Sequence, residues 1–380
     1  MIYFDNAATT YPKPEAVYRQ MEQALRQAVN IGRGSYEQAR QGAVMADGVR
    51  SKLLSLCHGT ESYRVILSPS ATVAANQVLQ GLDYGSVRRI YLTPYEHNAI
   101  VRTAAAMSRK YDAEICLVPV LKNGAIDLEQ LAYAFVQAPP DILCCTMVSN
   151  VTGYVLPVQE MIQAAQEAGA KVILDGAQAV GLLPVDLERL SPEYLIFAGH
   201  KTLYGSFGIG GFFMKRQEQL SPMLYGGNGI DSLNISMNQP GSGRYEPGSP
   251  DYIALASLSA ALDWLEQTGI SSLFFHEQYL IKMLAERLSQ IPGVTLYPAP
   301  DVQTGILAFS IEGYTPEEAG CILDEEFQIA VRTGYHCAPY VHDVIGTREQ
   351  KGCIRVSVGA FTAEKEIDCL VEAVRNIAEE

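Results

Sequence analysis

The sequence predicts a doubly wound α/β body with a mostly parallel sheet, followed by a smaller α+β part. Seven short apolar runs of strand-forming residues alternate with helical patterns through the first 250 residues. The runs are continuously apolar rather than alternating, which is typical of a parallel sheet that helices cover on both faces. After about residue 250, long helices lead into strands and helices of mixed order, and this change indicates the smaller part.

Each expected element occupies one such run. The strands of the body are expected at residues 63–68, 89–93, 114–120, 141–148, 171–175, 194–199 and 209–214. Helices are expected between several of them, at 73–82, 98–110, 127–137 and 157–168. The smaller part is expected to hold helices at 251–268, 272–291, 315–327 and from 363, and strands at 305–311, 329–333 and 353–358. We expect a large domain over residues 15–255 and a small α+β domain built from residues 1–14 plus 256–380.

Composition excludes several classes of partner. The 380-residue chain carries 28 Lys and Arg against 42 Asp and Glu, a formal charge of −14 without a visible basic cluster, so no nucleic acid is expected. No apolar stretch approaches the roughly 20 residues that span a bilayer, and no signal peptide is recognisable, so no membrane association is expected. The eight cysteines lack CxxC spacing, and the adjacent Cys144 and Cys145 point to opposite faces of an expected strand. They predict reduced thiols in a cytoplasmic protein and no metal site.

Ligands of open α/β sheets bind at the carboxyl ends of the strands, so residues that follow strands are the candidates for function. After strand 63–68, "PSATVAAN" opens a helix whose backbone amides, with the Thr72 hydroxyl, could cradle a phosphate or form an ordinary N-cap. His97 follows the next strand and could lie against a heteroaromatic ring, shuttle a proton, or simply be solvated. Asn150, after strand 141–148, is either a ligand donor or a turn residue.

Two further strand ends carry more specific chemistry. Asp175 ends "KVILD", where a carboxylate could hold a proton on a pyridine nitrogen, with Gln178 close enough in sequence to reach a ring hydroxyl; Asp175 could also only cap the next turn. Lys201 follows strand 194–199, beside His200, and is either an exposed lysine or a desolvated amine ready to form a Schiff base with a carbonyl. Together these groups are the inventory that pyridoxal 5'-phosphate requires.

The chain resembles the class V aminotransferase-fold pyridoxal-phosphate enzymes, and within them the cysteine desulfurases and selenocysteine lyases. The likeness runs from "YFDNAATTYPKP" to "RVSVGAFTAEKEID", and its most specific motifs are "DGAQAVG", "GHKTLYGSFGIGG", "RYEPGSP" and "RTGYHCAP". It implies the fold type I architecture of these transferases, with the cofactor bound in the large domain. It also implies a homodimer.

The resemblance assigns roles around the cofactor ring. It implies that Lys201 forms the Schiff base and moves protons at the substrate carbon, and that Asp175 pairs with the pyridine nitrogen. Gln178 is then the partner of the ring hydroxyl, and His97 stacks on the ring.

The resemblance also assigns the groups that hold the phosphate. They are the backbone of Ala71, the side chains of Thr72 and His200, and a hydroxyl from the partner subunit, which Ser249 in "RYEPGSP" matches.

The reaction class follows from three more matches. Arg355 matches the arginine that clamps the substrate carboxylate, a role suited to a planar fork of donors, and Asn150 is expected near the ring and substrate. Cys337, in "RTGYHCAP", matches the nucleophile of the short-loop desulfurases, which takes sulfur from cysteine as a persulfide and releases alanine. The implied partners are cysteine or selenocysteine and an acceptor protein for sulfur or selenium.

The motifs depart from the family pattern at several positions. Ala198 stands where a serine is common, Val73 where an acid is common, and Tyr36 where a histidine is common, while Tyr335 and His336 replace a histidine pair. These departures keep three alternatives open: a selenocysteine lyase, an aminotransferase in which Cys337 is incidental, and a non-enzymatic scaffold. The intact Lys201 argues against the scaffold.

Overall fold

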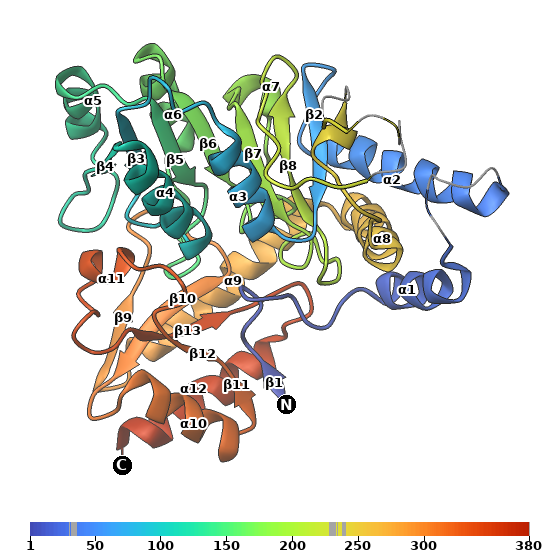
Figure 1. Ribbon diagram of the computed structural model, residues 1–380. Helices are drawn as coiled ribbons and strands as arrows, with labels where there is room; N and C mark the ends of the chain where they lie inside the picture. The colour runs from blue at the N-terminus through green and yellow to red at the C-terminus, as the bar shows by residue number, and fades with distance from the viewer. Residues whose placement is uncertain (30, 32–35, 228–232, 234, 238–240, 380) are drawn as a thin grey trace.

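A seven-stranded mixed sheet forms the larger part of the molecule (Figure 1). The computed structural model describes residues 1–29, 31, 36–227, 233, 235–237 and 241–379. β8 runs antiparallel to both of its neighbours, β2 and β7, and the other neighbouring strands are parallel. This confirms the predicted mostly parallel sheet. Its order is β2 (Tyr63–Ser68), β8 (Gly210–Lys215), β7 (Tyr194–Ala198), β6 (Lys171–Asp175), β5 (Ile142–Thr146), β3 (Arg89–Leu92) and β4 (Glu114–Leu117).

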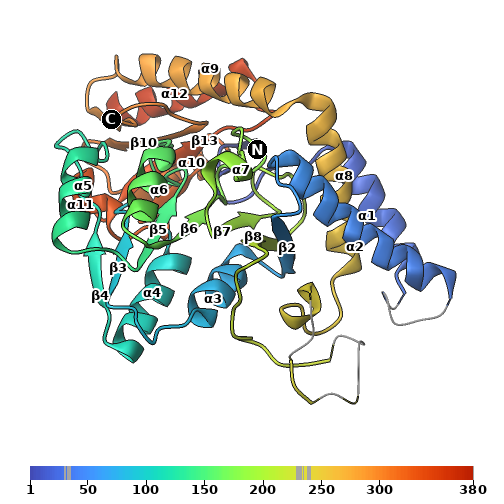
Figure 2. The same cartoon turned by 90° about the horizontal axis from the view of Figure 1, so that it is seen from above.

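Helices cover both faces of this sheet, as the continuous apolar strands predict (Figure 2). α3 (Ala71–Gly81) and α4 (Asn98–Tyr111) pack on one face, where Cys144 belongs to their apolar cluster. Cys145 points to the opposite face and its separate cluster. That second cluster includes side chains of α2 (Glu37–Leu56), α5 (Leu128–Gln137), α6 (Val158–Glu167) and α8 (Tyr252–Thr268). Among the described helices, none has the length and apolar character needed to cross a bilayer.

A four-stranded antiparallel sheet lies below the first in the view of Figure 1. Its strands, in order, are β12 (Arg332–Gly334), β13 (Cys353–Ser357), β10 (Ile306–Ile311) and β9 (Val294–Tyr297). α9 (Ile270–Leu288), α10 (Pro316–Glu325) and α12 (Glu364–Glu379) enclose a third apolar cluster against it. This part therefore mixes strands and helices, as expected.

The prediction of a single strand at residues 329–333 is wrong. The run divides at Val331 into β11 (Ile329–Ala330), which pairs in parallel with β1 (Ile2–Tyr3), and β12, which joins the four-stranded sheet. An apolar run carries no signal for a change of partner in its middle, so the local pattern reads as one strand. No element is predicted from the sequence at β1, α1 (Glu15–Gln27), α2, β9, or the short α7 (Leu187–Leu190) and α11 (Val341–Val344).

In the chain, α8 lies between the strands of the seven-stranded sheet and those of the four-stranded sheet. It packs against α1 (Glu15–Gln27) and α2, and its buried Leu255, Leu258 and Leu262 belong to the same apolar cluster as the large sheet. The expected division into residues 15–255 and residues 1–14 with 256–380 stays a prediction.

Candidate active site

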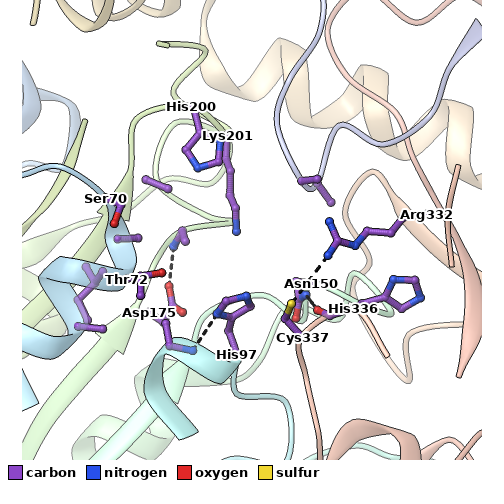
Figure 3. A pocket seen from close by; sticks show the side chains of 18 of the residues that line it. Ser70, Thr72, His97, Asn150, Asp175, His200, Lys201, Arg332, His336 and Cys337 are labelled. Carbon is purple, nitrogen blue, oxygen red and sulfur yellow. Dashed lines mark hydrogen bonds between the residues drawn. The ribbon is translucent and has the colours of Figure 1, made fainter. Parts of the chain in front are cut away.

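A cavity of about 210 Å³ lies at the carboxyl ends of the parallel strands, between the two sheets (Figure 3). The large sheet contributes residues that follow β2, β3, β5, β6 and β7, and the small sheet contributes residues of β12, β13 and the loop after β12. Most of the sequence-predicted site residues line it. They are Ala71, Thr72, His97, Asn150, Asp175, His200, Lys201, Cys337 and Arg355.

Lys201 and Asp175 both point into this cavity (Figure 3). Asp175 is buried at the end of β6, and its Oδ1 accepts a hydrogen bond of 2.9 Å from the Ala177 amide. Burial lowers the pKa of Lys201, with Asp175 opposing that shift and Arg355 reinforcing it. The lysine is thus a half-buried residue of the cavity rather than an exposed surface lysine, and a lowered pKa favours the neutral amine that attacks a carbonyl.

His97 is held in one orientation as the N-cap of α4. Its Nδ1 accepts a hydrogen bond of 3.0 Å from the Ala99 amide, which assigns the ring proton to Nε2. Burial, followed by the charge of Lys201, lowers the pKa of His97 to about 3. The ring is thus neutral and presents itself to the cavity (Figure 3), as stacking on a heteroaromatic ring requires.

The first turn of α3 is the candidate anion cradle and lines the cavity. Ser70 caps the helix by accepting a hydrogen bond from the Val73 amide, and Ala71 and Thr72 line the cavity beside it. Gly210 lies so close that an added Cβ would stand 2.8 Å from the Ala71 nitrogen. Helix N-termini bind phosphate through such free amides.

His200 also lines this cavity. Its ring stacks on Phe207 at a centroid distance of 4.7 Å, and its Nδ1 is buried without a hydrogen-bond partner. Burial lowers the pKa of His200 to about 4, so the ring is neutral. A buried nitrogen without a partner is costly, and a ligand in the cavity would satisfy it.

The loop that carries Cys337 is held in an uncommon conformation. His336 and Cys337 both have left-handed backbones, with φ of 47° and 57°. The Asn98 amide donates to the Cys337 carbonyl at 2.7 Å, and the Asn150 side-chain amide donates to the His336 carbonyl at 2.7 Å. Left-handed non-glycine residues cost about 1–2 kcal/mol each, so these contacts fix the thiol's position against strain.

Two arginines approach the cavity from the small sheet. Arg355 is 2% exposed; its Nη2 donates to Asp5 Oδ1 at 2.5 Å and its Nη1 to the Asn150 carbonyl at 2.9 Å, while its Nε has no partner. Arg332 reaches Cys337, with 3.8 Å between Nη2 and Sγ. Sequence reasoning missed Arg332 and Asp5, although both lie inside the quoted motifs "RTGYHCAP" and "YFDNAATTYPKP".

Gln178 and Ser249 are the two predicted residues that the chain does not bring to this cavity. Gln178 is buried beside it and donates its side-chain amide to the Ala7 carbonyl at 2.7 Å. Ser249 is exposed and lines a second cavity of about 350 Å³, together with Tyr245 and Leu255.

Of the residues that depart from the family pattern, some line the cavity and others are exposed at the surface. Ala198 and His336 line the cavity, so the missing serine hydroxyl at position 198 leaves a methyl group there. Tyr335 is exposed and donates its hydroxyl to the Arg348 carbonyl at 3.1 Å. Tyr36 is exposed at the start of α2.

Comparisons with known proteins match nearly the whole chain. The family described as aminotransferase class-V matches residues 2–370. A cysteine desulfurase of Pectobacterium atrosepticum is 29% identical over 385 residues, which cover 99% of this chain and 93% of that protein. The cysteine desulfurase structure from Thermococcus onnurineus NA1 aligns with a TM-score of 0.90 and 25% identity, covering 100% of this chain and 94% of that one. The cysteine desulfurase CsdA from Escherichia coli aligns with a TM-score of 0.87 and 27% identity, covering 99% and 94%.

Proposed function

The chain belongs to the aminotransferase class-V family, and from this premise we propose that it is a pyridoxal-phosphate-dependent cysteine desulfurase. The observation that carries the proposal is the meeting of Lys201, Asp175 and Cys337 in one cavity. An amine, a carboxylate and a thiol in one cavity suit a reaction on the side-chain sulfur of an amino acid. The thiol has no part in amine transfer, so its place in the cavity disfavours the aminotransferase alternative.

The residues present fit pyridoxal 5'-phosphate. The α3 cradle, with Thr72 and the unpartnered Nδ1 of His200, offers donors for the phosphate. Asp175 is available to the pyridine nitrogen, Lys201 to the aldehyde carbon, and the neutral His97 ring to the face of the cofactor. When bound, the cofactor supplies an electron sink for the substrate carbon.

The chain's own residues then divide the work. Arg355 binds the substrate carboxylate through its remaining donors, with Asn150 close by, and Lys201 moves a proton at the substrate carbon. The Cys337 thiolate attacks the substrate sulfur; a sulfur–sulfur bond forms on Cys337 as the carbon–sulfur bond breaks. The electron pair of the broken bond stays with the carbon fragment, which takes up a proton and leaves as alanine. An acceptor protein removes the sulfur from Cys337.

We also propose that the active form is a homodimer. Ser249 is exposed on a different cavity from Lys201, so a hydroxyl at this position can serve a phosphate only in a second copy of the chain. Gln178 lies beside the cavity and reaches the ring hydroxyl of the cofactor if its bond to Ala7 rearranges. All eight cysteines are free thiols, which fits the proposed location in the reducing cytoplasm.

The test is the intact mass of the holoenzyme before and after L-cysteine, with alanine measured in parallel. We expect a gain of one sulfur atom that disappears in Cys337→Ser. Cys321→Ser, which removes an exposed thiol on α10, is the matched control and should keep the gain. No gain on a protein that retains its cofactor would refute the desulfurase. Selenide release that survives Cys337→Ser would then favour the selenocysteine lyase.

A further inference from the structure

The N-terminal segment of residues 5–13, here called the N-terminal strap, runs from the small sheet to the loop that carries Lys201 (Figure 1). We propose that the strap is a positioning element that sets Arg355 and Lys201 relative to one another, with Asp5 and Lys13 as its two anchoring side chains. The inference rests on the proposed roles of Arg355 in substrate binding and of Lys201 in cofactor binding.

The first anchor fixes the substrate side of the cavity. Asp5 accepts the hydrogen bond from Arg355 Nη2 and so holds a buried guanidinium whose charged neighbours in the cavity, Arg332 and Lys201, are also cationic side chains. The strap is tied to the same strand at Ser357, which accepts from Asn6 Nδ2 at its carbonyl (3.0 Å) and from the Ala7 amide at its hydroxyl (2.8 Å). Asp5 therefore orients the Arg355 guanidinium together with the Asn150 carbonyl, and the bonds to Ser357 hold the strap in register with β13.

The second anchor fixes the cofactor side. The His200 carbonyl accepts hydrogen bonds from Thr9 Oγ1 (3.0 Å), the Thr10 amide (3.2 Å) and Lys13 Nζ (2.9 Å). Thr10 Oγ1 also lies 3.2 Å from the carbonyl of Lys201 itself. These bonds hold the two peptide groups that flank the Lys201 α-carbon.

Lys13 is an unusual residue for such a position. Its ammonium directs its three donors at Thr10 Oγ1 (2.7 Å), the His200 carbonyl and, at 3.5 Å, Thr9 Oγ1. No carboxylate forms an ion pair with it among the residues that the structure describes. Burial lowers the pKa of Lys13 to about 7, so its placement opposes its charge. An amine kept there without an acid supplies donors that no apolar side chain of the same length supplies.

Between the two anchors the strap touches a third predicted site residue. The Ala7 carbonyl accepts from the Gln178 side chain, and Ala7 and Ala8 line the cavity. The strap thus spans from the arginine that meets the substrate carboxylate to the lysine that meets the cofactor. Substitutions at its two ends should therefore affect different properties, because Asp5 contacts Arg355 and Lys13 contacts the His200 carbonyl next to Lys201.

The experiment reconstitutes the full-length protein with pyridoxal 5'-phosphate and measures the cofactor Kd, the visible band of the bound cofactor and the KM for cysteine. Lys13→Met should weaken cofactor binding about tenfold or more and alter the visible band, since it removes the hydrogen bonds to the Thr10 hydroxyl and the His200 carbonyl. Lys13→Arg should restore most of the affinity. Thr10→Val, which keeps the volume and loses one hydroxyl, should give a smaller loss of several-fold.

A substitution at Asp5, the other anchor of the strap, should change the KM for cysteine rather than the cofactor Kd. Asp5→Asn should raise the KM about tenfold while the cofactor Kd and the visible band stay within about twofold of the unaltered protein. Lys122→Met, an exposed lysine far along the chain, is the control for loss of a positive charge.

Outcomes separate this inference from the proposed function. If the unaltered protein binds no cofactor or forms no persulfide, the proposed function fails. If the unaltered protein works but Lys13→Met behaves like Lys122→Met, or if both ends change the cofactor Kd and the KM alike, the strap is only a structural segment and the inference is wrong. If Lys13→Met does not fold, Thr10→Val with unaltered cofactor binding overturns it equally.

Discussion

Replacing Gly210 with alanine should weaken cofactor binding and destabilise the fold. Gly210 begins β8, and an added Cβ would lie 2.8 Å from the Ala71 nitrogen, 2.9 Å from the Phe197 carbonyl oxygen and 2.9 Å from the Ser70 carbonyl carbon. All three are backbone atoms, so no flexible side chain can yield. Ordinary contact begins near 3.4 Å, and the start of α3 must therefore retreat by about 0.6 Å.

The size of the effect follows from that retreat. Overpacking of this kind costs about 1–3 kcal/mol of unfolding free energy. The displaced amides are those of the phosphate cradle, and the loss of one charge-assisted hydrogen bond, about 1.5–3 kcal/mol, weakens cofactor binding at least about tenfold.

The assay is urea unfolding of the cofactor-free protein together with a titration by pyridoxal 5'-phosphate. Gly48→Ala is the matched control: Gly48 lies within α2, and an added Cβ meets nothing within 4 Å. That variant should gain about 0.5–1 kcal/mol, because alanine is the better helix former. An unchanged cofactor affinity in Gly210→Ala would refute the assignment of the phosphate to the start of α3.

Three further predictions test the site and the fold. Lys201→Ala should abolish turnover and the visible band of the bound cofactor, as absorbance and alanine assays would show; a variant with full activity contradicts its role. Asp175→Asn should lower kcat by about a hundredfold or more, since a preorganised charge is lost, while circular dichroism stays unchanged. Burial raises the pKa of Glu277, on α9, to about 8, so the folded state holds a proton that the unfolded state loses above its ordinary pKa of 4.5. Stability should therefore fall as pH rises between these values, by at most about 1.4 kcal/mol per pH unit, and Glu277→Gln should be the more stable protein in urea unfolding at pH 8 but not at pH 4.5. The exposed Glu286→Gln on the same helix is its control, and equal pH slopes in both variants would contradict the burial argument.

The candidate site was predictable where chemistry follows a strand. Asp175 and Lys201 stand directly after strongly apolar runs, and parallel strands bring their carboxyl ends to one edge. Cys144 and Cys145 fall on opposite faces because the strand's period is two. These are local signals, and the structure follows them.

What sequence reasoning missed depends on contacts across the chain. Arg332 sits in the second half of a run that reads as one strand, and only pairing with β13 turns it toward the cavity. Asp5 and Lys13 occupy a segment without an apolar period, so nothing local shows that they meet Arg355 and the His200 carbonyl. Contacts between residues so far apart in the sequence are set by the packing of the whole molecule and leave no local sequence pattern.

The pairing of Asp5 with Arg355 has a consequence for how the protein matures. These two residues are 350 positions apart, and Lys201 lies between them. The cavity wall therefore closes only when the first and last portions of the chain have met. Because Asp5 is synthesised long before β13, the complete pocket forms only after β13 has also been synthesised. Capture of the cofactor in this pocket then requires that the segments around Asp5 and Arg355 are both present and paired, and fragments that lack either segment should be unable to retain it.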